Sequence, residues 1–194
     1  MENKKIKIGI DLDDTVWKFH EKFFEFYNEK YGTSYSVDNY DIYNFEEFLG
    51  ITREQVFSLL DEHETLDKYK KIPLLDFVKE SLLELDKKYE IHFITARADY
   101  QKDLILSRLS EIFDRELPIF FQYDENRNEK CGKVDYCLEN GIKIMIDDGY
   151  HNLIKCSENG IKCFLIDYAW NKEKELNENI IRVNNWKEIM EEIK

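Results

Sequence analysis

The chain has 194 residues, of which 43% are hydrophobic, and a formal net charge of −13 at pH 7. This size and composition fit one folded domain with room for an elaboration, and they exclude a disordered or fibrous chain. The negative charge argues against a nucleic-acid polymer or an anionic membrane surface as partner, because both bind clusters of Lys and Arg. A small phosphorylated substrate is compatible with this charge if a metal ion and one or two cationic side chains bind it locally.

No targeting or membrane-spanning segment is evident in the sequence. Residues 1–5 are polar and lead directly into the first predicted strand. The four cysteines have no C-x-x-C spacing, which favours free buried thiols in a reducing compartment over a zinc site. They are Cys131, Cys137, Cys156 and Cys163. We therefore expect a cytoplasmic protein.

The first predicted strand, Ile6–Ile10, ends in the acidic sequence Asp11-Leu12-Asp13-Asp14-Thr15. Isoleucines alternate along the strand with the period of two that is typical of a sheet. Asp11 and Asp13 are two residues apart, so their carboxylates leave an extended backbone on the same side. Like charges this close indicate a site that binds a cation or carries out phosphate chemistry. The alternative is that Asp13-Asp14-Thr15 merely caps a helix.

A mostly helical stretch rich in aromatic residues follows. The first helix is predicted over Val16–Tyr31, because Phe19 and Phe23 begin an apolar stripe of period 3.6. Residues 32–50 are predicted to be turn-rich. Thr52-Arg53-Glu54-Gln55 forms a capping box, which predicts a second helix from Arg53 to about Glu64.

Pro73 is predicted to open a third helix, because proline is favoured at the first helical position. Its buried face would consist of Leu74, Val78, Leu82 and Leu85. No Pro-, Gly- or Ser-rich linker marks a boundary on either side of the aromatic stretch. We therefore expect residues 17–71 to be a helical cap inserted into a core made of residues 1–16 and 72–194.

Strands alternate with helices in the rest of the chain. The predicted strands are Ile91–Ile94, Pro118–Phe121, Ile142–Ile146, Lys162–Ile166 and Ile180–Val183. One predicted helix is capped by Asp99 and turns Ile105, Leu109 and Ile112 inward. A second begins at Lys133 and carries Val134, Cys137 and Leu138 on one side. The last is Trp186–Ile193. Gln122–Gly132 is predicted to be a loop. The repeated sequence Glu-Asn-Gly ends a helix twice, at Gly141 and at Gly160. This alternation predicts a Rossmann-like α/β fold, a parallel sheet with helices on both faces.

Ligands of such sheets bind outside the carboxyl ends of the strands. The polar residues at those ends are Asp11, Asp13, Thr95, Asp147 and Asp148. Lys133 opens the helix before the fourth strand, so its ammonium group is expected at the same edge. Lys130 is the competing lysine. Several carboxylates at one edge repel each other unless a hard cation binds them, and Mg²⁺ is the usual choice beside phosphate.

These motifs resemble those of the haloacid dehalogenase superfamily of phosphohydrolases. The first motif of this superfamily, D-x-D-x-T, is matched by residues 11–15, and the second, a strand that ends in Thr, is matched at Thr95. The third motif is a Lys, matched by Lys133, and the fourth is an acidic pair, matched by Asp147-Asp148. The resemblance covers essentially the whole chain. The helical insertion and Asn152, which follows the acidic pair, resemble more narrowly the 5′(3′)-deoxyribonucleotidases and their bacterial relatives.

The resemblance implies a Mg²⁺-dependent phosphomonoesterase, and the narrower match implies a 5′-nucleotidase. Asp11 would be the nucleophile that forms an aspartyl-phosphate, and Asp13 the general acid and then base. Thr95, the Ala96 N–H and Lys133 would stabilise the phosphoryl oxygens. The Asp11 carboxylate, the Asp13 carbonyl and either Asp147 or Asp148 would bind Mg²⁺.

The substrate is less well defined by the sequence. Phe19 either stacks on a nucleobase or belongs to the core, and Arg97 either reaches the substrate or forms an ion pair. His92 is expected in the core, and no role is predicted for His20, His63 or His151. A phosphatase of another small metabolite, such as a sugar phosphate, is the alternative function. A non-catalytic ligand-binding member is a third hypothesis, disfavoured by the complete motif set.

Overall fold

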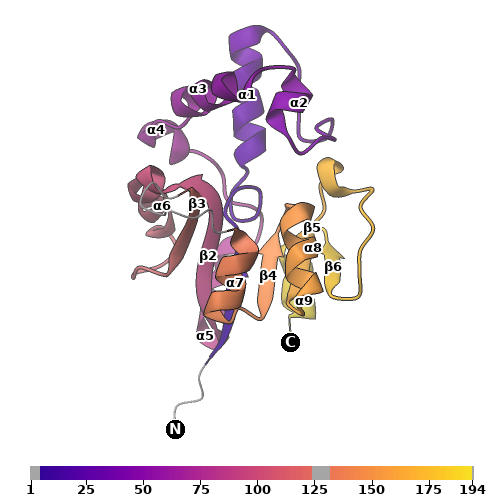
Figure 1. Cartoon of the computed structure of the whole chain (residues 1–194). Coiled ribbons are helices and arrows are strands. Elements are labelled where there is room, and N and C mark those ends of the chain that lie inside the picture. The colour runs from indigo at the N-terminus through magenta and orange to yellow at the C-terminus, as the bar shows by residue number, and fades with distance from the viewer. Residues whose placement is uncertain (1–4, 124–131, 194) are drawn as a thin grey trace.

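A computed structural model of the chain describes residues 5–123 and 132–193 (Figure 1). Its strands form one six-stranded sheet in the order β3-β2-β1-β4-β5-β6, and all the pairings are parallel. The strands are β1 Ile6–Ile10, β2 Tyr89–Ala98, β3 Ile119–Tyr123, β4 Ile144–Asp147, β5 Lys162–Ile166 and β6 Ile180–Val183. The predicted parallel α/β sheet is confirmed.

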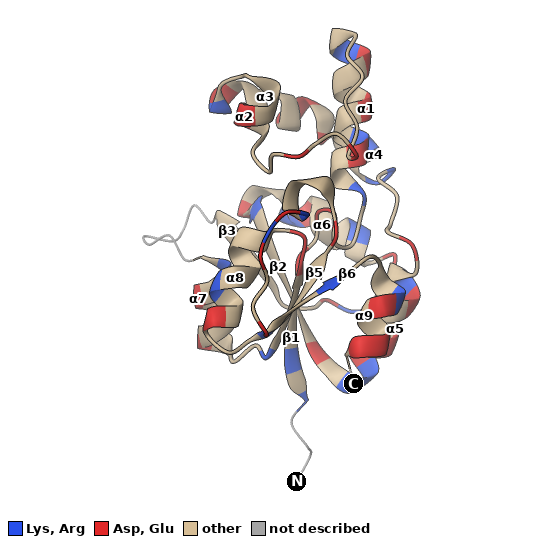
Figure 2. Cartoon of the chain, turned by 90° about the vertical axis from the view of Figure 1, so that its right-hand side faces the viewer, with Lys and Arg blue, Asp and Glu red and all other residues tan. Residues whose placement is uncertain are grey.

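Helices cover both faces of this sheet. Figure 2 shows α7 and α8 on one side of the strands and α5 and α9 on the other. The four helices are α5 Val78–Lys88, α7 Lys133–Asn140, α8 Tyr150–Glu158 and α9 Trp186–Glu192. The α7 and α8 face contains a compact cluster that includes Cys137, Met145 and Leu165. The other face belongs to a larger cluster that continues into the helices above the sheet.

The centre of the sheet is packed tightly around Gly9 of β1. A Cβ atom at this position would lie 2.6 Å from Cδ1 of Ile94 and 2.7 Å from the sulfur of Met145. Those two side chains come from the neighbouring strands β2 and β4, so only glycine lets them meet across β1. This packing fixes the strand whose end carries Asp11.

Four helices lie over the carboxyl edge of the sheet, at the end opposite to the two termini (Figure 1). They are α1 Phe19–Tyr31, α2 Phe45–Leu49, α3 Arg53–His63 and α4 Leu66–Tyr69. The chain leaves the sheet through Val16–Lys18 and returns to it through Pro73–Leu75, and these two segments are paired. The Lys18 N–H donates to the Pro73 carbonyl and the Leu75 N–H to the Val16 carbonyl, each at 2.9 Å. We call this pair of segments the joint.

This joint explains two wrong predictions of helix boundaries. Pro73 does not open a helix, because Leu74 pairs with Trp17 across the joint and α5 begins only at Val78. The first helix begins at Phe19 rather than Val16, because Asp14 has a φ of +52° and the backbone turns sharply there. At Pro73 a tertiary contact overrides the local signal, and at Asp14 a backbone turn delays the start of the helix.

Other predictions differ in detail. The turn-rich segment contains the short helix α2, β2 continues to Ala98, and β4 begins at Ile144 rather than Ile142. Asp99 does not cap an α-helix but starts the 3₁₀ turn η1 Asp99–Gln101, which precedes α6 Lys102–Leu109. Ile112 is buried as predicted, but it lies beyond the end of α6. Leu138, predicted to lie on the apolar side of its helix, is exposed. The remaining 3₁₀ turn is η2 Ala169–Asn171.

The junctions predicted from local chemistry are confirmed. The capping box is present at α3, where Thr52 accepts the Gln55 N–H and Gln55 accepts the Thr52 N–H. Gly141 and Gly160 both have a positive φ, of 69° and 77°. In the part of the chain that the structure describes, no helix has the length and apolar character needed to cross a membrane.

Candidate active site

The candidate site lies where β1 is flanked by β2 and β4, at the carboxyl edge of the sheet. Ile10, the last residue of β1, pairs with Phe93 on one side and with Ile146 on the other. Asp11 and Asp147 each follow one of these paired residues, so the sheet register places them side by side. This point, at which the strand order reverses, is where open α/β sheets bind ligands.

Lys133 joins these two carboxylates. Its Nζ lies 2.7 Å from Oδ1 of Asp11 and 2.8 Å from Oδ2 of Asp147. All three side chains are buried. Burial alone would lower the pKa of Lys133, but the charges of Asp11 and Asp147 overcome this effect and hold its pKa above the ordinary value. The two carboxylates therefore favour the charged form of Lys133 at the centre of the site.

The loop after β4 orients Asp147. The Gly149 N–H donates to Oδ1 of Asp147 at 2.7 Å, and Nδ2 of Asn152 donates to Oδ2 at 3.3 Å. A Cβ on Gly149 would lie 2.9 Å from Oδ1 of Asp147, so the glycine lets the carboxylate turn back onto the backbone.

The neighbouring Asp148 is held by a different segment, because Trp170 of η2 donates from Nε1 to Oδ2 of Asp148 at 3.0 Å.

Asp11, Asp147 and Asp148 form a buried acid cluster. One oxygen from each lies within 4.8 Å of the other two. Burial raises the pKa of Asp11 to about 7 against the opposing charge of Lys133, with Asp147 and Asp13 adding to the rise. Burial and the charge of Asp147 raise the pKa of Asp148 well above its ordinary value. Three carboxylates facing one ammonium group leave negative charge unbalanced, and a hard divalent cation with oxygen ligands fits this donor set.

Asp13 lies outside the acid cluster and faces a cavity of about 440 Å³. Its Oδ1 accepts a hydrogen bond from Nε1 of Trp17 at 2.8 Å. Arg97 donates from Nε to Oδ2 at 2.7 Å and from Nη2 to Oδ1 at 2.9 Å. The ion-pair alternative for Arg97 is therefore the one observed, although the residue also lines the cavity.

Asp14 has a structural role, that of capping a helix, which was the alternative interpretation of the acidic sequence at residues 11–15. Both of its carboxylate oxygens lie 3.2 Å from the His20 N–H in the first turn of α1. A second contact joins Oδ2 to Nδ1 of the buried His20 ring. Asp14 thus anchors the start of the first helix, and Asp11 and Asp13 face the site.

Thr95 and Ala96 lie in an irregular part of β2. The pairing with β3 shifts between Thr95 and Ala98, which is the geometry of a β-bulge. Thr95 is buried, and its Oγ1 accepts the Arg97 N–H at 3.2 Å. Ala96 is exposed and lines the cavity. The bulge accounts for the direction of Arg97, which returns toward β1 and Asp13.

The cavity beside Asp13 lies between the helical segment and the sheet. Apolar and aromatic side chains line much of it, together with the carboxylates of Asp61 and Glu64. Its aromatic lining residues are Phe19, Phe57, Tyr100 and Tyr123. Phe19 is only 5% exposed and also stacks on Phe23, so it belongs to both the core and the cavity wall.

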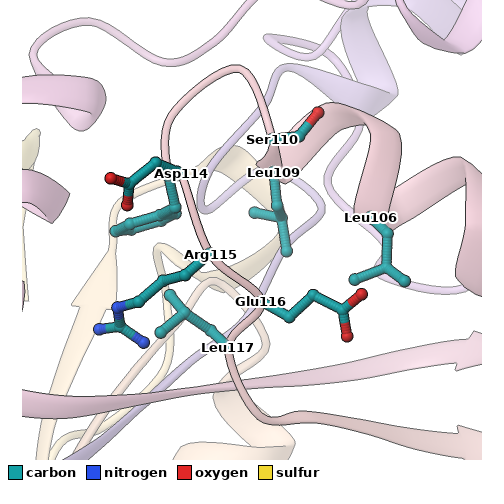
Figure 3. Close-up of a pocket in the computed structure, with 8 residues that line it drawn as sticks. Leu106, Leu109, Ser110, Asp114, Arg115, Glu116 and Leu117 are labelled. Atoms are coloured by element: carbon teal, nitrogen blue, oxygen red, sulfur yellow. The ribbon is translucent and has the colours of Figure 1, made fainter.

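A second cavity, of about 420 Å³, lies at the end of α6 (Figure 3). Its lining combines Leu106, Leu109 and Leu117 with charged side chains such as Arg115, which pairs with Asp86 at 2.5 Å. None of the described residues that line it belongs to the predicted site. The cavity beside Asp13, in contrast, is lined by Asp13, Ala96 and Arg97 of the predicted site.

The remaining histidines and cysteines lie as expected from the sequence. His92 is buried inside β2 and contacts Tyr136 and Glu90. Burial lowers the pKa of His63 to about 4. Among the described residues, the free cysteines Cys137, Cys156 and Cys163 are buried. Cys131, Lys130 and most of the predicted 122–132 loop lie outside the described residues.

Sequence reasoning missed several side chains that complete the site. Trp170 comes from a segment with no recognisable motif, and Glu64 lies at the end of the helix that the capping box predicts. Tyr43 comes from the segment predicted only as turn-rich, yet its hydroxyl would lie 3.2 Å from a Cβ on Gly149. Burial and the charges of Asp148 and Asp147 raise its pKa well above the ordinary value. The concentration of aromatic residues between Trp17 and Phe48 was the only signal for Tyr43.

The sheet order is that of haloacid dehalogenase-like folds, and the acid cluster lies at the switch point of this sheet. The fold is shared with the haloacid dehalogenase-like hydrolase SP0104 of Streptococcus pneumoniae, with a TM-score of 0.66 at 15% identity, covering 98% of this chain and 99% of that one. It is also shared with the HAD-hydrolase YfnB of Bacillus subtilis, solved bound to magnesium, with a TM-score of 0.59 at 16% identity, covering 98% of this chain and 99% of that one.

The particular family follows from the sequence comparisons. The family model described as "5' nucleotidase, deoxy (Pyrimidine), cytosolic type C protein" matches residues 4–194, and the chain belongs to this family. YqfW of Bacillus subtilis is 28% identical over 190 residues, which are 96% of this chain and 92% of that protein. The nucleotidase CA_C3379 of Clostridium acetobutylicum is 27% identical over 189 residues, 96% of this chain and 92% of that protein. Family and fold identify the chain as a hydrolase of phosphate monoesters.

Proposed function

We propose that this protein is a Mg²⁺-dependent 5′-nucleotidase that dephosphorylates (deoxy)nucleoside monophosphates through an aspartyl-phosphate intermediate. The observation that carries the proposal is the pairing of Asp11 with the Lys133 ammonium group beside an aromatic-lined cavity. This pairing supports Asp11 as the attacking carboxylate, and the cavity is suited to a flat apolar group attached to the phosphate.

In the first step, an oxygen of Asp11 attacks phosphorus, and the bond to the leaving oxygen breaks. Asp13, on the cavity side, enters this step protonated, gives its proton to that oxygen and is left as the carboxylate, and the nucleoside departs as an alcohol. In the second step, Asp13 takes a proton from water, whose oxygen attacks phosphorus. The bond to Asp11 breaks, and inorganic phosphate leaves. Asp11 and Asp13 return to their starting states.

Three donors would stabilise the negative charge on the phosphoryl oxygens during both steps. Lys133 supplies a fixed ammonium group, and Thr95 a buried hydroxyl whose oxygen already accepts the Arg97 N–H. The N–H of Ala96 is the third donor, in the irregular part of β2. Donors fixed before the reaction stabilise the transition state without reorganisation.

The acid cluster would hold Mg²⁺ through the carboxylates of Asp11 and of Asp147 or Asp148, together with the Asp13 carbonyl. When bound, Mg²⁺ neutralises negative charge on the transferring phosphoryl group. The three buried oxygen donors, which lie within 4.8 Å of one another, support a divalent cation in this place.

We further propose that residues 17–71 act as a cap that selects the substrate. The paired joint at Val16–Lys18 and Pro73–Leu75 supports this division of the chain. Phe57 of α3 and Phe19 at the start of α1 line the cavity, and their rings are suited to stacking on a nucleobase. The free buried thiols support a reducing, cytoplasmic location.

A phosphatase of a small sugar phosphate is the second candidate. The carboxylate of Asp61 on the cavity wall favours it, because it can accept hydrogen bonds from sugar hydroxyls. This function predicts no dependence of KM on a nucleobase.

One assay separates the two candidates. Phosphate release is measured with Mg²⁺ from a panel of nucleoside monophosphates and sugar phosphates, with Asp11→Asn as the inactive control. We expect turnover of nucleotides that the substitution abolishes. Turnover of sugar phosphates alone would refute the nucleotidase, and no turnover of any phosphoester would refute both candidates.

A further inference from the structure

Arg97 connects the Asp13 carboxylate to the helical segment above the sheet. Two of its nitrogens bind Asp13, at 2.7 and 2.9 Å, and Nη1 lies 2.7 Å from Oε1 of Glu64. Glu64 is the residue at the C-terminal end of α3. The side chains of Arg97 and Glu64 are 6% and 4% exposed, so this network is shielded from solvent.

The guanidinium group is also held from its two sides. It lies 4.9 Å from the ring centre of Phe19 and 4.8 Å from that of Tyr69. All three of its nitrogens contact carboxylates, and the two aromatic rings limit the rotation of the guanidinium group. A guanidinium group fixed in this way cannot turn toward a substrate without breaking a buried ion pair.

The Asp13 carboxylate is correspondingly oriented. Oδ1 accepts from Trp17 and Arg97, and Oδ2 accepts from Arg97. Its side chain is 23% exposed, on the side that lines the cavity. The donors therefore restrain the carboxylate and leave one side open to the group that occupies the cavity.

We propose that Arg97 is a positioning residue that holds Asp13 in the orientation needed for proton transfer to the leaving oxygen, and that Glu64 links this orientation to the helical segment. The inference rests on the proposed function, in which Asp13 is the general acid. It assigns Arg97 to the proton-transfer step instead of to substrate binding. A lysine cannot take over this role, because one ammonium group cannot reproduce a two-point contact with a carboxylate.

The leaving group of the substrate provides the decisive test. A nucleoside leaves as a strongly basic alkoxide and needs a proton, whereas the nitrophenolate of p-nitrophenyl phosphate leaves without one. We expect Arg97→Lys to lower the single-turnover rate of leaving-group release from a nucleoside monophosphate by about 10²-fold or more, which is the contribution of a general acid. The same variant should retain most of its single-turnover rate of nitrophenolate release from p-nitrophenyl phosphate. Single turnovers are compared because the later hydrolysis of the aspartyl-phosphate uses Asp13 as base with both substrates. Asp13→Asn should show the same preference.

Two further variants complete the experiment. Glu64→Gln keeps the two-point contact between Arg97 and Asp13, and we expect a smaller loss with the same preference for p-nitrophenyl phosphate. Arg108→Lys is the matched control, because Arg108 is equally buried but binds Glu111 and the Ile72 carbonyl, away from the site. It should leave the ratio of the two rates unchanged. Circular dichroism checks that each variant is folded.

The possible results lead to distinct conclusions. An equal loss on both substrates, or no loss, in folded Arg97→Lys would overturn the inference and leave the proposed function standing. If Arg97→Lys does not fold, an unchanged rate ratio in Glu64→Gln overturns the inference instead. A wild-type protein that releases phosphate from no phosphoester would overturn the proposed function and this inference with it.

Discussion

The acid cluster and the neighbouring cavity differ in how their side chains are held. Around Asp11, the charged groups are buried and bonded to one another. In the cavity, the aromatic rings of Phe57, Tyr100 and Tyr123 are 49%, 67% and 46% exposed. The first region comes from β1, β4 and α7, and the second mainly from α3, η1 and the end of β3. This contrast suggests that chemistry depends on a rigid network in the core, and that substrate choice depends on an open surface.

Loss of the nucleophile should have the largest effect. Asp11→Asn removes the attacking oxygen but keeps the size of the side chain, so kcat should fall by more than about 10⁴-fold on every substrate. Phosphate release under saturating substrate measures this effect. A variant that retained a tenth of the wild-type kcat would show that another residue attacks phosphorus.

Metal removal should have the next largest effect. Dialysis against a chelator should lower the rate by about 10³-fold, in keeping with a loss of several kcal/mol of charge stabilisation. Added Mg²⁺ should restore activity. Full activity in the chelated enzyme would mean that the acid cluster needs no cation for catalysis.

Lys133→Gln tests the rigid network directly. The substitution removes the fixed charge between Asp11 and Asp147, and kcat should fall by about 10²–10³-fold, as when one charge-stabilising donor is lost. The loss should be the same for a nucleotide and for p-nitrophenyl phosphate, since both transfer the same phosphoryl group. A loss confined to nucleotides would place Lys133 in substrate selection.

The predictability of these two regions also differs. The ends of parallel strands converge by topology, so Asp11, Asp147 and Lys133 could be placed together from the order of strands and helices alone. The contact between Arg97 and Glu64 could not, because it depends on a bulge in β2 and on how α3 packs above the sheet. Local signals failed where tertiary contacts outweigh them, as at Pro73.

Phe57→Ala should have the smallest effect and the most selective one. Stacking of a base on an aromatic ring is worth about 1–3 kcal/mol, so KM for a nucleoside monophosphate should rise by roughly 10-fold or more. We expect kcat to stay near the wild-type value, and hydrolysis of deoxyribose 5-phosphate, which has no aromatic ring to stack, to be unaffected. Equal changes for both substrates would indicate that α3 had shifted as a whole.

We propose that the cavity recognises a nucleobase, whereas Lys133, Thr95 and Ala96 bind only the phosphate group. The most direct measurement compares kcat/KM for a deoxynucleoside monophosphate with that for deoxyribose 5-phosphate, which lacks the base. We predict that the nucleotide is favoured by about 10-fold or more, the contribution of one stacked base. Equal or better hydrolysis of deoxyribose 5-phosphate would contradict the claim.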